Sequence, residues 1–191
     1  MERKGILLLI FFLVSVTAHE RILAQEPVDY APKMLGKEIR QVFSIEDPVV
    51  AEIDTGMAGP EMGKYFLLTD GKTATGYVYI GRIYSCRAGG CDLLTPDQAS
   101  NNSEYFDYFI LFNPSGSIAS VRVYNYHATH GQEVTAKSWL RKFQGYDAGY
   151  ELSGKQSIDA IAGATVSSAG IISDVQIRTK YLRSLIRTGK L

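Results

Sequence analysis

Three hydroxyl side chains follow a run of small residues near one end of this 191-residue chain. The run Ala162-Gly163-Ala164 leads directly into Thr165, and Ser167 and Ser168 follow closely. Serine and threonine are common at helix starts, and small residues allow the backbone to approach a ligand closely. A helix beginning here would present unpaired N–H groups and a partial positive charge to an anion. The pattern therefore indicates either a phosphate-binding helix start or an ordinary helix start behind a tight turn.

A long amphipathic segment follows these hydroxyl residues. Four basic residues fall late in it, where cations complement the dipole of a helix: Arg178, Lys180, Arg183 and Arg187. Apolar residues recur from Val166 onward at the spacing of one helix face: Ile171, Ile172, Val175, Tyr181, Leu182, Leu185 and Ile186. The segment therefore predicts a long C-terminal helix.

Four strand-like segments precede this helix, and their aromatic and β-branched residues favour extended structure. Turn signals join the first pair at Asp70-Gly71 and the second pair at 113–116. The predicted strands run from Lys64 to Thr69, Thr73 to Tyr84, Tyr105 to Phe112 and Ser117 to Tyr126.

Two shorter helical segments complete the predicted elements. One is a helical turn around Trp139, from Lys137 to Phe143, and the other is a short amphipathic helix carrying Met34 and Leu35. The economical fold class is α+β, with a twisted antiparallel sheet packed against a few helices.

The composition supports a folded core, since 46% of the residues are hydrophobic and 11% are aromatic. Twenty basic and twenty acidic residues cancel, so charge gives no reason to expect a nucleic-acid partner.

The N-terminal segment has the features of an export signal. Charged residues Glu2-Arg3-Lys4 precede an apolar run from Gly5 to Val16, which is short for a membrane-spanning helix. Cleavage after Ala18 or after Ala24 satisfies the preference for small residues. We therefore predict a signal peptide over residues 1–24, while an uncleaved membrane anchor remains the alternative.

The chain has two cysteines, Cys86 and Cys91, separated by Arg-Ala-Gly-Gly. In an exported protein this pair favours a disulfide, either structural or redox-active. A zinc site has little support, because no second Cys/His pair stands at ligand spacing, and no metal site is predicted.

The segment Asp159 to Thr165 resembles the flavinylation motif of the FMN-binding domain family, Asp-x-x-(Ser/Thr)-Gly-Ala-(Thr/Ser). In that family the last hydroxyl residue carries FMN through a phosphoester bond. Members include flavin-carrying components of the sodium-translocating NADH:quinone oxidoreductase and of the Rnf complex. Ala162 departs from the motif, because the family usually has serine or threonine there.

Two further segments extend the resemblance. The run from His127 to Gly131 is similar to a family loop written His-x-x-Thr-Pro-Gly, and Gly89-Gly90 stands where a glycine-containing loop touches flavin in relatives. Together with Trp139, these segments imply a set of cofactor-binding residues: Asp159, Ala162, Gly163, Ala164, Thr165, Val166, Ser167, Ser168, His127, Thr129, His130, Gly131, Trp139, Gly89 and Gly90. Tyr124 and Tyr126 are further candidates for contact with the flavin ring, although aromatic residues are more often part of the core.

The resemblance implies that Thr165 holds FMN covalently and that Asp159 is needed for recognition by a flavin transferase. We therefore expect residues 61–191 to form an FMN-binding domain, behind a linker and short helix over residues 25–60. The chain shows no acid–base constellation for turning over a substrate, so an electron carrier fits better than an independent enzyme.

The expected carrier is exported, periplasmic or on the outer face of the cytoplasmic membrane. Its expected partners are the transferase and membrane or envelope redox proteins. The alternative, favoured by Ala162, is a non-redox structural or interaction module that binds flavin loosely or not at all.

Overall fold

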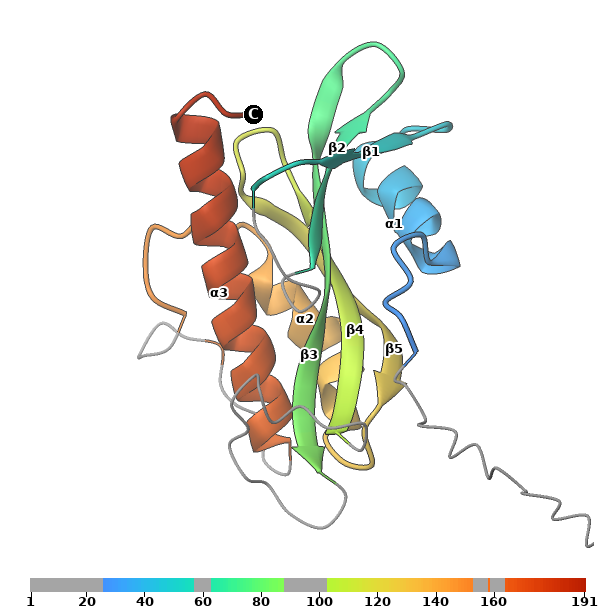
Figure 1. Ribbon diagram of the computed structural model, residues 1–191, viewed down its shortest axis with the longest axis vertical. Helices are drawn as coiled ribbons and strands as arrows, with labels where there is room; N and C mark the ends of the chain where they lie inside the picture. Colours follow the sequence, from blue (N-terminus) through green and yellow to red (C-terminus); the bar gives the residue numbers. More distant parts are fainter. Residues whose placement is uncertain (1–25, 57–62, 88–102, 153–157, 159–163) are drawn as a thin grey trace, which may run out of the picture.

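A computed structural model describes residues 26–56, 63–87, 103–152, 158 and 164–191. These residues form a five-stranded antiparallel sheet with helices on both faces, an α+β fold as predicted (Figure 1). The strand order β1-β2-β3-β4-β5 follows the chain, so each strand pairs with its sequence neighbour. The strands are β1 (Val49–Ile53), β2 (Lys64–Thr69), β3 (Ala74–Arg87), β4 (Ser103–Phe112) and β5 (Ile118–His127).

Strands β2 to β5 confirm the four predicted strands, and β2 has the predicted bounds. The turn between β2 and β3 is fixed locally, because the Asp70 carboxylate accepts hydrogen bonds from the backbone of Lys72 and Thr73 at 2.9 and 2.7 Å. Strand β1 was not predicted. It is short and largely exposed, and its residues from Val49 to Ile53 pair along the edge of β2.

The two faces of the sheet carry different helices. Helix α1 (Lys33–Phe43) covers one face, and α3 (Thr165–Arg187) covers the other together with α2 (Lys137–Leu140) (Figure 1). The 3-10 turns η3 (Gln132–Thr135) and η4 (Arg141–Phe143) flank α2. All three predicted helical segments are therefore confirmed.

Side chains alternate between two hydrophobic cores, as the two-residue period of a strand requires. In β4, Phe106, Tyr108 and Ile110 belong to the core under α3, whereas Phe109 and Leu111 belong to the core under α1. The sheet is thus buried on both faces.

A polar network joins α3 to its face of the sheet. The buried Tyr108 hydroxyl donates a 2.5 Å hydrogen bond to Asp174, and Asp174 forms a 2.9 Å ion pair with Arg178 one helical turn later. The Arg178 guanidinium lies 5.0 Å from the centre of the Tyr79 ring, and Tyr65 donates to the Arg178 carbonyl. Arg178 was expected only to complement the helix dipole. The structure shows that it is buried against the sheet.

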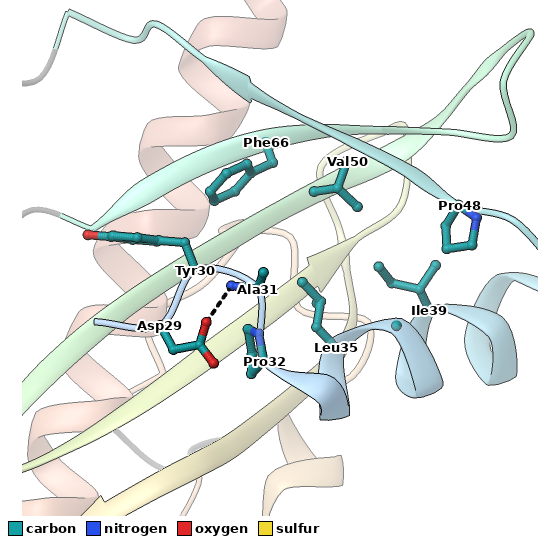
Figure 2. A pocket seen from close by; sticks show the side chains of 10 residues that line it. Asp29, Tyr30, Ala31, Pro32, Leu35, Ile39, Pro48, Val50 and Phe66 are labelled. Atoms are coloured by element: carbon teal, nitrogen blue, oxygen red, sulfur yellow. Dashed lines mark hydrogen bonds between the residues drawn. The ribbon is translucent and has the colours of Figure 1, made fainter. Parts of the chain in front are cut away.

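The α1 side of the sheet contains a cavity of about 510 Å³. Its lining is mostly apolar and comes from the segment before α1, from α1 itself and from β1 and β2; Leu35, Ile39, Val50 and Phe66 point toward it (Figure 2). The cavity is lined by α1, β1 and β2, whereas α3, which begins at Thr165, covers the opposite face of the sheet (Figure 1).

Candidate functional site

Helix α3 begins at Thr165, directly after the buried residue Ala164. No side chain of the described residues forms a capping hydrogen bond at this end, and the first turn contains no acidic residue. The first backbone N–H groups of α3 are therefore not capped by a described side chain. Such a helix start binds anions well, because its N–H groups and the positive end of its dipole point the same way.

The three hydroxyl residues of this turn differ in their surroundings. Ser168 is fully buried and donates back to the Thr165 carbonyl at 3.2 Å. Ser167 is 2% exposed, and its hydroxyl lies 2.9 Å from the hydroxyl of Ser85 on β3. Thr165 is exposed, as is its neighbour Val166. Of these three hydroxyl residues, Thr165 is the one that is exposed to solvent.

The loop after β5 packs against this helix start. Gly131 has a φ of +87°, and a Cβ placed there would lie 2.8 Å from the Ser167 hydroxyl and 3.1 Å from the Tyr126 hydroxyl. The Tyr126 hydroxyl donates to the His130 carbonyl at 2.5 Å, while the Thr129 hydroxyl donates to Glu104. The structure thus brings the end of the 127–131 loop to the first turn of α3.

A β-bulge decides which side chains of β5 face α3. Asp107 pairs with Asn125, whereas the next residue of β4, Tyr108, pairs with Val123. Tyr124 is therefore an extra residue in β5, and it reverses the alternation beyond it. As a result, Tyr126 stacks on Phe106 in the core under α3, with ring centroids 5.7 Å apart.

The same bulge turns His127 to the other face of the sheet. Its ring stacks on Tyr105 at 4.9 Å, and the Arg82 guanidinium lies 3.7 Å from the centre of the same tyrosine ring. Arg82 also forms an ion pair of 2.7 Å with Asp107. The structure therefore does not bring the His127 ring to Thr165, although the backbone of its loop approaches α3.

The other aromatic candidates lie deeper or farther away. Trp139 is 7% exposed and packs edge-to-face on Phe143 at 5.4 Å, within the core under α3. Tyr124 stacks on Phe109 on the α1 side and donates a hydrogen bond to the Asp29 carbonyl at 2.7 Å. Among the aromatic candidates, Tyr126 is the one whose hydroxyl reaches the start of α3.

Burial raises the pKa of the Tyr126 phenol, and a hydrogen bond with Ser167 partly offsets this effect. The phenol is therefore neutral at neutral pH and can both donate and accept hydrogen bonds. Ser85 and Tyr126 together hold Ser167. The sequence analysis did not predict a role for Ser85. The one feature that could have indicated it is that Ser85 carries a hydroxyl and lies on the same face of β3 as the core residue Ile83.

Several predicted residues lie outside the described part of the chain: Asp159, Ala162, Gly163, Gly89, Gly90 and Cys91. For Cys86 the structure describes the backbone, at the end of β3. The disulfide and the glycine loop therefore stay predictions. The signal peptide also falls outside the described residues.

Residues 105–177 match the family model described as the FMN-binding domain. This segment begins in β4, passes through β5 and the 127–131 loop, and ends in α3 beyond Thr165. The match confirms the resemblance to the FMN-binding domain family over these residues, and it supports a flavin-binding role. No curated protein matches the chain. Among the residues that the structure describes, no helix combines the length and apolar character needed to cross a lipid bilayer.

Proposed function

We propose that this protein is an exported flavoprotein electron carrier that holds FMN through a phosphoester bond to Thr165. It receives its flavin from a flavin transferase and passes electrons between membrane or envelope redox proteins, in the periplasm or on the outer face of the cytoplasmic membrane. The exposure of Thr165, at a helix start that no described side chain caps, is the observation that carries this proposal.

The residues at the start of α3 fit the phosphate of FMN. The backbone N–H groups of the first turn can donate to phosphate oxygens, while Ser167 and Ser168 are occupied by contacts within the protein. Gly131 and Tyr126 hold the neighbouring loop against this turn. The phosphate end of the site is therefore better defined than the ring end, because Trp139 is buried and the His127 ring faces away.

Bound FMN would supply the redox chemistry, and the chain would supply attachment, orientation and control of water access. Covalent attachment suits an exported protein, because lost FMN is not readily replaced outside the cytoplasm. Donors at the N-terminus of α3 would also stabilise the negative charge of the phosphodiester once it has formed.

Denaturing gel electrophoresis tests the attachment after coexpression with a flavin transferase. We expect fluorescence that survives denaturation in the wild type and in Thr165→Ser, which keeps a hydroxyl, but not in Thr165→Val, which has a similar shape without one. Ser168→Ala is the matched control and should stay fluorescent, because the Ser168 hydroxyl is turned into the helix. Fluorescence in Thr165→Val, or loss of it in Ser168→Ala with folding intact, would contradict the assignment.

The second candidate function is a non-redox module of the cell envelope with loosely bound or no flavin. It is favoured by Ala162, which stands where the motif usually has a hydroxyl residue. A colourless wild-type protein, made beside a control that the same transferase flavinylates, would support this module over the carrier.

A further inference from the structure

A second cavity lies at the open edge of β5, away from the Thr165 turn. It has a volume of about 160 Å³ and is bounded by α1, β5, α2 and η4. At about 30 Å³ per water molecule, this is the space of about five waters. The cavity therefore has room for a small polar ligand. Its polar lining residues are Glu38, Gln41, Ser120, Arg122, Arg141 and Gln144.

Arg122 is held in place but keeps an unused donor. Its Nη2 forms a 2.7 Å ion pair with Glu38, and its Nη1 donates to the Val121 carbonyl at 2.9 Å. Its Nε is buried and has no hydrogen-bond partner among the described residues. A buried charged group with an unpaired donor is unfavourable, and an anion bound beside the guanidinium would offset the cost of burying its charge.

The remaining charges of the cavity favour an anion. Arg141 is exposed and forms no ion pair with another described residue, so it adds a second positive charge to the lining. Glu38 is the one acidic lining residue, and its Oε1 already accepts from Arg122 and from Ser120 at 2.7 Å. The two arginines and one glutamate leave a net charge of +1, which a monoanion would neutralise.

The side-chain amides add donors that a carboxylate can use. Gln41 on α1 and Gln144 after η4 line the same cavity as the two arginines, and each carries an NH₂ group. A metal ion has no comparable support, because the described residues contain no group of three or more His, Cys, Asp or Glu side chains. Guanidinium groups pair well with planar carboxylates through parallel hydrogen bonds.

We propose that this cavity is a binding site for a small monocarboxylate, held by Arg122 and Arg141. Arg122 is the fixed part of the site, because Glu38 and the Val121 carbonyl orient its guanidinium. Arg141 is the adjustable part, since its side chain is exposed. The site is independent of the proposed flavin attachment, because it lies beside α1 and the outer edge of β5.

Calorimetric titration with sodium acetate in a zwitterionic buffer tests the site, with sodium chloride as the control for ionic strength. We expect saturable one-to-one binding by the wild type, which Arg141→Ala weakens by about tenfold because it removes a hydrogen bond to a charged group. Lys142→Ala is the matched control. It removes the same charge from the neighbouring exposed residue, which does not line the cavity.

The Nε–H resonance of Arg122 gives a second readout by NMR. It should move on addition of acetate but not of chloride, and the dependence on acetate concentration should follow the calorimetric curve. Equal weakening of acetate binding in Arg141→Ala and Lys142→Ala would show an adventitious ion only and overturn the proposal. Chloride binding as strong as acetate binding would have the same meaning. An unmoved Arg122 resonance at saturating acetate would also overturn it.

Discussion

Replacing Gly131 with alanine tests the contact between the 127–131 loop and the first turn of α3. An alanine at a φ of +87° must adopt a left-handed conformation, which costs about 1–2 kcal/mol for an L-residue. Alanine also restricts the unfolded chain more than glycine does, and this restriction stabilises the folded state by about 0.4–1 kcal/mol. The added Cβ also lies 2.8 Å from the Ser167 hydroxyl, and such overpacking typically costs about 1–3 kcal/mol. The expected loss of unfolding free energy is therefore about 1–5 kcal/mol, with a central value of about 3 kcal/mol.

Gly145 provides a matched control. Its φ is +83°, but a Cβ added there meets no heavy atom within 4 Å. Gly145→Ala should therefore cost about 1 kcal/mol, from the backbone alone. The difference between the two variants isolates the contact with α3. The double variant Gly131→Ala/Ser167→Ala should recover part of that difference, because it removes the hydroxyl nearest to the added Cβ.

Urea unfolding followed by circular dichroism measures these free energies for all the variants. Equal losses in Gly131→Ala and Gly145→Ala would refute the packing of the loop against α3. The packing would also be refuted if the loss in the double variant equalled the sum of the losses in Gly131→Ala and Ser167→Ala, because residues in contact should show a coupling energy.

Tyr108→Phe should lower the unfolding free energy by about 1.5–3 kcal/mol, because it removes a hydrogen bond to the charged Asp174. Tyr146→Phe loses a bond to a neutral carbonyl and should cost less; equal losses in urea would contradict this. Burial raises the pKa of the Tyr65, Tyr79 and Tyr108 phenols. The stability that these phenols contribute to the folded state is fully present below about pH 10, the pKa of tyrosine in the unfolded chain. It falls as the pH rises above that value, because the unfolded chain releases protons that the folded chain keeps. Phenolate absorbance should therefore rise fully only on alkaline unfolding, and ionisation of all twelve tyrosines in protein that still gives a native circular dichroism spectrum would refute this.

The predicted elements depended on local signals. Aromatic and β-branched residues favoured β2 to β5, and the Asp70 side chain bonds within its own turn. Helix α3 begins at Thr165, where a run of small residues ends and apolar residues begin to recur at helical spacing. Each of these signals acts between residues close in sequence, so the chain alone carried it. Strand β1 lacked such a signal, because its pairing with β2 gives it extended structure.

The orientation of the site depended on tertiary structure. Strict alternation from Val121 and Val123 would have placed His127 on the α3 face, but the bulge at Tyr124 turns His127 away and brings Tyr126 there. A bulge depends on the register of the partner strand, which no local pattern reveals.

The roles of the hydroxyl residues also depended on contacts between distant segments. The sequence by itself determined that three hydroxyl residues stand at a helix start. Only the fold decided that Thr165 faces solvent, because Ser85 on β3 engages Ser167 and the first turn of the helix encloses Ser168. The physical reason is that burial and partner choice depend on which distant surfaces meet, whereas helix and strand formation depend largely on neighbours in the chain.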